Sequence, residues 1–182
     1  VAEAAKGRRV VRLKSGDPGV FGRATEELDA AHAAGIAVEI VPGVTAASAA
    51  GAAMGRSLTQ RGRTDTLVLA TATYCEGAHA PDWARHAVPG TSLVFYMGVR
   101  AAAGIAATLR ARGVRDDTVV TIAADVSRDS QAIIGTTLRD FPAEIERQAL
   151  TGNALIMLTL PSEAASTAPL RDATESRVSL TA

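Results

Sequence analysis

Short apolar runs alternate with helical segments along most of this chain, and this alternation limits its fold more than any other feature. Strands separated by helices indicate an α/β fold, and continuous apolar runs are typical of largely parallel, buried sheets. The predicted strands lie at 9–13, 37–41, 66–72, 92–97, 118–123, 131–134 and 154–160, and the predicted helices at 25–34, 45–54, 81–86, 100–112 and 141–149.

A polar segment divides the chain into two parts. Residues 60–65 (QRGRTD) contain no apolar side chain, and regular strand–helix alternation begins only after them. We therefore expect the C-terminal part of a first α/β half at 1–62, a second half at 63–161 and a poorly ordered tail at 162–182. The chain opens at Val1 in what reads as the end of a helix, without the apolar core of a signal peptide, so we expect the first half to lack its start.

The composition excludes several classes of protein. Nineteen basic residues balance nineteen acidic ones, which argues against a uniformly basic nucleic-acid binder, and 3% aromatic residues leave few rings for base stacking. The apolar runs are too short to span a bilayer. Cys75 is the single cysteine, which excludes an internal disulfide framework. We expect a cytoplasmic protein without nucleic-acid or membrane partners.

The turn at 15–19 (SGDPG) is the most informative motif because it follows a strand-type run and carries an acid. Gly16 permits close approach of a ligand to the backbone, and Asp17 could accept a hydrogen bond from a ligand hydroxyl or ammonium group. The simpler interpretation is a tight turn in which Asp17 bonds its own backbone. Spacing alone favours the simpler interpretation.

A second motif, VPGVTAAS at 41–48, places a Pro-Gly turn before a helix. Thr45 is positioned to cap that helix. Small residues leave room beside the helix N-terminus, whose free N–H groups can receive a polar or anionic ligand group. An ordinary N-cap explains Thr45 equally well when it is considered alone.

Other chemistry-bearing residues give weaker signals. His32, His79 and His86 lack metal-ligand spacing, so no metal site is expected. Cys75 has no evident base beside it and is interpreted as a structural thiol. Trp83 is interpreted as a core anchor of its short helix.

Taken together, the motifs resemble the S-adenosylmethionine-dependent uroporphyrinogen-III C-methyltransferases, which belong to the tetrapyrrole methylases. The resemblance covers roughly residues 1–160 and implies two α/β/α halves with the cofactor in the cleft between them, and a homodimer. The matching segments are RLKSGDPGVFGR (12–23), VPGVTAASAA (41–50), SLTQRG (57–62), PDW (81–83), TSLVFYMG (91–98), GTTL (135–138) and NALI (153–156).

The resemblance also implies which residues contact the cofactor. They come from the family's GGDP turn, its Thr-Ala pair, its FYM methionine and two positions at later strand ends. Three residues depart from the family pattern: Ser15 replaces a glycine, Gln60 replaces a histidine, and Val126 is bulkier than the usual residue. The implied cofactor contacts are Ser15, Gly16, Asp17, Val20, Thr45, Ala46, Met97, Val126 and Ala154.

For the substrate, uroporphyrinogen III, arginine forks are the natural partners of its carboxylates. Phe21 and Arg23 match family positions near the reaction centre, and Lys14 is a further candidate cation. No catalytic residue is assigned, because the family's acid/base groups are expected upstream of Val1. The implied substrate-binding residues are Arg12, Phe21, Arg23, Arg61 and Arg63.

The implied reaction methylates uroporphyrinogen III at C2 and C7, giving precorrin-2 for siroheme or cobalamin synthesis and S-adenosyl-L-homocysteine as by-product. The methyl group is already activated on a sulfonium, so the protein's task is alignment. Two alternatives remain at this stage: a methyltransferase of a later precorrin, and a truncated, non-catalytic cofactor-binding fragment. The downstream branch and a possible fusion to a dehydrogenase/ferrochelatase module also stay open.

Overall fold

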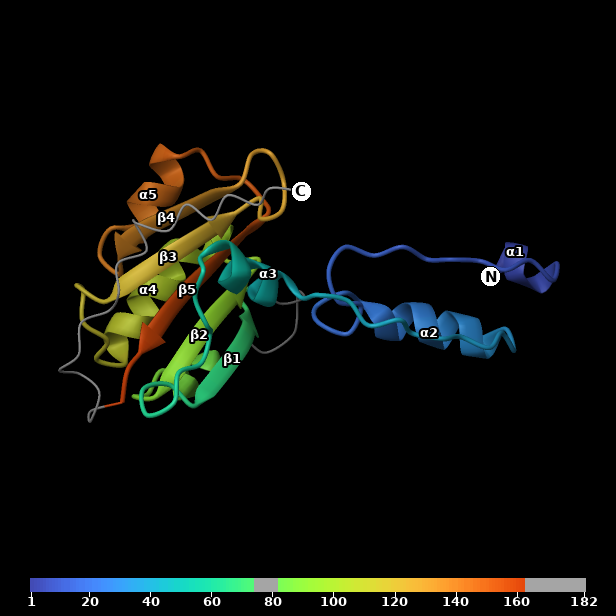
Figure 1. The fold of residues 1–182 in the computed structure, drawn as a ribbon, viewed down its shortest axis with the longest axis horizontal. Coiled ribbons are helices and arrows are strands. Elements are labelled where there is room, and N and C mark those ends of the chain that lie inside the picture. Colours follow the sequence, from blue (N-terminus) through green and yellow to red (C-terminus); the bar gives the residue numbers. More distant parts are fainter. Residues whose placement is uncertain (74–81, 163–182) are drawn as a thin grey trace. The chain divides into compact units, whose positions relative to one another are not determined.

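The computed structural model describes residues 1–73 and 82–162, and the chain divides into two compact units, Val1–Ala46 and Ala47–Ala182 (Figure 1). This division falls before the boundary predicted at 62–63. Helix α3 (Ala46–Ala53) and the segment after it account for the difference, because Met54 and Leu58 lie over the sheet of the second unit. Cys75, His79, Pro81 and the predicted tail after residue 162 lie outside the described residues.

The second unit contains a five-stranded sheet in the order β1-β2-β5-β3-β4, which confirms the predicted α/β class. The expectation of a largely parallel sheet is wrong: β1 and β2 are parallel, but β2–β5, β5–β3 and β3–β4 are antiparallel. A short turn at 125–131 joins β3 to β4, and only antiparallel neighbours can be connected so directly. The strands are β1 (Thr66–Thr71), β2 (Thr91–Tyr96), β3 (Val119–Ala124), β4 (Ala132–Thr137) and β5 (Ala154–Leu160).

One face of this sheet carries the main core. Helices α4 (Ala102–Ala111) and α5 (Phe141–Arg147) pack on it, as Figure 1 shows, and bury apolar side chains of the central strands. Trp83, in the short 3₁₀ helix η1 (Trp83–His86), meets Phe95 edge-on with ring centroids 4.6 Å apart, so its prediction as a core anchor is confirmed. A second 3₁₀ turn, η2 (Val99–Ala101), leads into α4.

The first unit contains helices α1 (Ala2–Ala5) and α2 (Ala24–Ala33). Residues 1–46 are all described and form no strand, so the strands predicted at 9–13 and 37–41 are wrong for this structure. These segments have no hydrogen-bonded neighbour, and an extended segment becomes a strand only when its backbone groups pair with another one. Helix α2 ends as predicted, with Gly35 following it at φ +68°.

Among the described residues, no helix has both the length and the apolar character needed to cross a membrane.

Candidate functional site

Asp17 joins the two glycine-containing turns of the first unit. Its Oδ1 accepts a hydrogen bond from the Gly19 N–H at 2.7 Å, which is the turn geometry that the simpler interpretation predicted. Its Oδ2 accepts from the Gly43 N–H at 3.0 Å. The motifs at 15–19 and 41–48 therefore lie against each other, and one carboxylate holds both.

Close backbone packing between the two turns requires glycine at position 43. A Cβ atom on Gly43 would lie 2.3 Å from the Gly16 carbonyl oxygen, which no real contact allows. Gly16 itself has φ +78°, a conformation that side-chain-bearing residues rarely adopt. Ser15 and Gly16 are exposed, so their backbone is open to a ligand, while Val20 is half-buried beside them.

In the second unit, the structure brings three predicted cofactor residues to one edge of the sheet. Phe95 of β2 pairs with Ile156 of β5, and Ala124 of β3 pairs with Ala154 of β5. Because β5 is antiparallel to both neighbours, its amino end lies between the carboxyl ends of β2 and β3. Met97, Val126 and Ala154 follow or occupy these three strand ends, and ligands of open α/β sheets bind at such carboxyl ends.

Backbone strain concentrates at the predicted site residues. Six non-glycine residues in 1–73 and 82–162 have positive φ, and five of them are predicted site residues or direct neighbours of Val126. Such conformations cost on the order of 1–3 kcal/mol each and persist at ligand sites where the surroundings fix them. The six residues are Phe21, Arg23, Met97, Asp125, Ser127 and Ala149, of which Ala149 alone lies apart from the predicted set.

The packing around Met97 explains why its side chain is half exposed. Gly98 packs against the core, since a Cβ atom added to it would lie 2.9 Å from Ile156 Cδ1. The residue before it, Met97, therefore points outward. Met97 has φ 55° and is 50% exposed. Thr73 Oγ1 lies 3.6 Å from its sulfur and donates to it. Half of the Met97 side chain therefore remains accessible at the sheet edge, while its sulfur contacts Thr73.

The turn that carries Val126 is held by two residues that the sequence analysis missed. The side-chain amide oxygen of Gln131 accepts from the Ser127 N–H at 2.9 Å, and Asp125 Oδ2 accepts from Ser130 Oγ at 3.1 Å. The Asp125 N–H donates to the Asn153 carbonyl at 2.8 Å, which ties the turn to the residue before Ala154. The polar run after β3 signalled a turn but not which side chains would close it.

Three predicted substrate-binding cations lie in ion pairs of the first unit. Arg12 and Lys14 approach Glu27 at 3.2 and 2.9 Å, and Arg23 approaches Glu26 at 2.9 Å. The hydrogen bond from Lys14 is the main cause that lowers the pKa of Glu27, and the bond from Arg23 lowers that of Glu26. Arg12 and Arg23 are well exposed, so they can turn toward a carboxylate ligand.

The other two predicted arginines differ in environment. Arg61 is exposed on the segment before β1. Arg63 is 9% exposed and is therefore buried.

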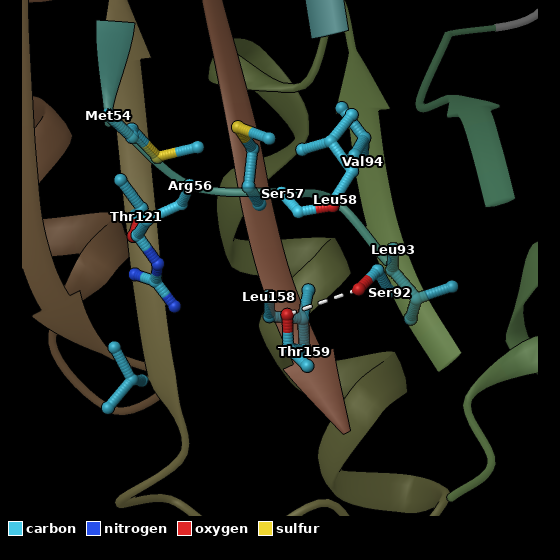
Figure 2. Close-up of a pocket in the computed structure, with 12 residues that line it drawn as sticks. Met54, Arg56, Ser57, Leu58, Ser92, Leu93, Val94, Thr121, Leu158 and Thr159 are labelled. Carbon is cyan, nitrogen blue, oxygen red and sulfur yellow. Dashed lines mark hydrogen bonds between the residues drawn. The ribbon is translucent and has the colours of Figure 1, made fainter. Parts of the chain in front are cut away.

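A pocket of about 50 Å³ lies on the sheet face opposite α4 and α5 (Figure 2). Met54, Arg56 and Leu58 cover one side of it, and Ser92 and Thr159 share a hydrogen bond of 3.2 Å on its floor. None of the predicted site residues lines this pocket. Within the described parts of the chain, no group of His, Cys, Asp and Glu side chains is arranged to hold a metal ion.

The second unit gathers small and sulfur-bearing residues at its strand ends, and the first unit carries a glycine-rich acidic turn; both features are typical of small-molecule-binding enzyme domains. The chain belongs to the tetrapyrrole (corrin/porphyrin) methylases, whose family profile matches residues 1–142.

Particular relatives sharpen this assignment. The chain is 38% identical over 157 residues to the siroheme synthase of Tolumonas auensis, covering 86% of this chain and 33% of that protein. It resembles the structure of uroporphyrin-III C-methyltransferase from Thermus thermophilus in complex with S-adenosyl homocysteine, with a TM-score of 0.71, 31% identity, and coverage of 92% of this chain and 72% of that one. It also resembles a cobalt precorrin-4 methyltransferase, with a TM-score of 0.77, 25% identity, and coverage of 87% and 66%.

The chain thus spans about a third of the length of the siroheme synthases it matches.

Proposed function

We propose that this chain provides S-adenosylmethionine-dependent methylation of uroporphyrinogen III at C2 and C7, giving precorrin-2 on the route to siroheme or cobalamin. The observation that carries the proposal is the similarity to the Thermus enzyme, which extends over 92% of this chain and is accompanied by a bound adenosyl ligand in that structure. The siroheme synthase relatives support the same reaction.

The predicted cofactor residues fit an adenosyl ligand with an amino-acid tail. At Gly16 the exposed backbone has no side chain to hinder a ligand, and Asp17 supplies a carboxylate next to it in sequence. Met97 offers an exposed apolar surface, and Ala154 is too small to block the strand end. The residues proposed to hold the cofactor are Ser15, Gly16, Asp17, Val20, Thr45 and Ala46 from residues 1–46 and Met97, Val126 and Ala154 from the second unit.

When bound, the cofactor supplies an activated methyl group on a sulfonium. The task of the chain's own residues is to bind the cofactor and the substrate and to orient them for the transfer. Asp17 keeps the turns at 15–19 and 41–48 together, and the strained backbone at Met97 presents its side chain at the sheet edge. Alignment of reacting groups of this kind can lower a barrier by up to roughly 7–11 kcal/mol.

Carboxylates of the substrate would meet cations of the first unit. Arg12 and Arg23 are exposed and already bind carboxylates of this chain, so a substrate carboxylate would exchange with Glu27 or Glu26. We include Phe21, Arg61 and Arg63 in the proposed substrate-binding set on the family resemblance.

The proposal extends to the setting of the enzyme. We propose that it acts in the cytoplasm as a homodimer, without nucleic-acid or membrane partners. The balanced charge and the single cysteine support the setting, and the family resemblance supports the dimer.

Calorimetric titration with S-adenosylhomocysteine tests the cofactor site, and saturable binding is expected. Absence of binding heat would leave the chain as a member of the family without a working cofactor site. Mass spectrometry of the product then tests the reaction: uroporphyrinogen III should gain two methyl groups.

A later precorrin is the second candidate substrate, favoured by the TM-score of 0.77 to the cobalt precorrin-4 methyltransferase. Methylation of a precorrin but not of uroporphyrinogen III would select this candidate. The higher sequence identity to the uroporphyrin-III enzyme, 31% against 25%, supports the first one.

A further inference from the structure

Tyr96 connects the end of a central strand to the beginning of a helix. Its hydroxyl oxygen accepts a hydrogen bond from the Ala47 backbone N–H at 2.9 Å. Both residues are buried, with Tyr96 9% and Ala47 0% exposed. Tyr96 is the last residue of β2 and points to the sheet face opposite α4 and α5, where the first turn of α3 lies.

This bond satisfies a backbone group that the helix cannot satisfy itself. The first N–H groups of an α-helix have no partner within the helix, and a buried N–H without a partner is costly. Most helices meet this need with a nearby Ser, Thr, Asp or Asn side chain. Here a tyrosine 49 residues away in sequence does so for Ala47.

The bond links two residues that are each the direct neighbour of a proposed cofactor contact. Tyr96 directly precedes Met97, and Ala47 directly follows Ala46, which begins α3. The Tyr96 carbonyl also accepts from the Ala72 N–H at 3.1 Å, so the residue is fixed on its backbone side as well. Tyr96 is thus held through its hydroxyl and through its backbone carbonyl. This anchoring can maintain the strained conformation of Met97, because such a conformation persists only where the surrounding structure fixes it.

We propose that Tyr96 is a positioning residue of the cofactor site: its hydroxyl fixes the first turn of α3 against the strand end that presents Met97. The inference rests on the proposed function, because it assigns Tyr96 to the support of the same cofactor residues. Tyr96 acts through its neighbours and needs no contact with the cofactor.

Tyr96→Phe removes the hydroxyl and keeps the ring, so the core stays filled. The loss of one buried hydrogen bond should weaken S-adenosylhomocysteine binding about three- to tenfold in calorimetric titration. Ser92→Ala is the matched control. It removes the Ser92–Thr159 hydroxyl contact on the same strand and the same face, away from the Met97 end, and should leave the affinity within about twofold.

Amide hydrogen exchange gives a readout that does not depend on ligand binding. The Ala47 amide should be protected in the parent chain, and Tyr96→Phe should speed its exchange while Ala50, buried further along α3, keeps its rate. Unchanged Ala47 exchange would overturn the inference.

The outcomes also separate the inference from the proposed function. If the parent chain binds S-adenosylhomocysteine and Tyr96→Phe binds it equally well, the inference is wrong and the proposed function stands. If the parent chain shows no binding, the proposed function fails and takes the cofactor role of Tyr96 with it, whereas Ala47 exchange still decides whether the hydroxyl orders α3.

Discussion

The two units contain similar apolar runs but use them differently. In the second unit, Leu93, Phe95 and Ile156 are completely buried between the sheet and its helices. In the first unit, Val11 and Leu13 are 78% and 83% exposed, although their segment has the β-branched composition of a strand. The difference teaches that such a run becomes a buried strand only where a neighbouring strand satisfies its backbone.

Polar contacts therefore carry more of the local order in the first unit. Asp17 bridges two turns, and Glu27 pairs with two cations from the segment before the SGDPG turn. The second unit depends on its apolar core and on backbone ladders. Substitutions should accordingly have large effects on stability in the second unit and more local effects in the first.

The largest expected effect separates the two units directly. Phe95→Ala should lower the free energy of unfolding by about 3–5 kcal/mol, because it empties a fully buried site beneath Trp83. Leu13→Ala, the matched apolar truncation in the first unit, should change it by less than about 0.5 kcal/mol. Urea unfolding followed by circular dichroism measures both. Similar losses for the two variants would contradict the comparison.

A smaller effect is expected at the junction of the two turns in the first unit. Gly43→Ala places a methyl group against the Gly16 carbonyl and should cost about 1–3 kcal/mol in the stability of this local packing, measured by hydrogen exchange of the Gly19 and Gly43 amides.

Gly104→Ala is the control for that substitution. Gly104 lies in α4 with open space around its Cβ position, so alanine should stabilise the second unit by about 0.5–1 kcal/mol. If Gly43→Ala also stabilised the protein, the close approach of the two turns would be wrong.

The success of the sequence predictions follows the same division. Strand β5 was predicted with its observed bounds, and β1, β2 and α4 were predicted to within a few residues. The pattern of apolar residues indicates these elements because each of them buries apolar side chains in the sheet and its covering layer. Strand direction was not predictable: β5 inserts between β2 and β3, and nothing in its composition states its orientation. The segments at 9–13 and 37–41 read as strands because propensity carries no information about a pairing partner.

The candidate site shows the same limit. The turns around Asp17 and Thr45 were found from glycine and proline spacing, and Met97 from a family motif. Tyr96 and Gln131 were missed, since each acts through a contact with a backbone group that is distant in sequence or hidden in a turn. The backbone at Met97 and Asp125 is strained because their φ angles are positive. The type of residue at these positions does not predict a positive φ angle.

Asp17→Ala should weaken S-adenosylhomocysteine binding about tenfold, equivalent to ~1.4 kcal/mol, because the two turns lose their shared acceptor. The free energy of unfolding should fall by less, since both N–H groups can bond to water. Asp29→Ala on the exposed face of α2 is the matched control and should leave both quantities unchanged. A loss of stability without loss of affinity would show that Asp17 serves the turn alone.

The smallest effect concerns the charges of the first unit. Lys14 and Arg12 lower the pKa of Glu27 from its ordinary value of 4.5, with the Lys14 hydrogen bond as the largest cause. A carboxyl whose folded pKa is lowered contributes stability that is present above the unfolded pKa and is lost as pH falls through the folded pKa. Acidification below about pH 4.5 should therefore loosen this pair before it affects the core of the second unit.

Lys14→Met tests that contribution while keeping most of the side-chain volume. The Glu27 titration midpoint, followed by carboxyl ¹³C NMR, should move up toward 4.5 but not reach it, because Arg12 remains 3.2 Å away. Asp117 in the second unit, whose pKa is lowered by its hydrogen bond with Arg115, should keep its midpoint and serves as the internal control. Stability at pH 7 should change little, because the Glu27 carboxylate is exposed and solvent screens its ion pairs. An unmoved Glu27 midpoint would mean that Lys14 does not pair with it in solution, and Arg12 would then be the remaining partner of Glu27 in the first unit.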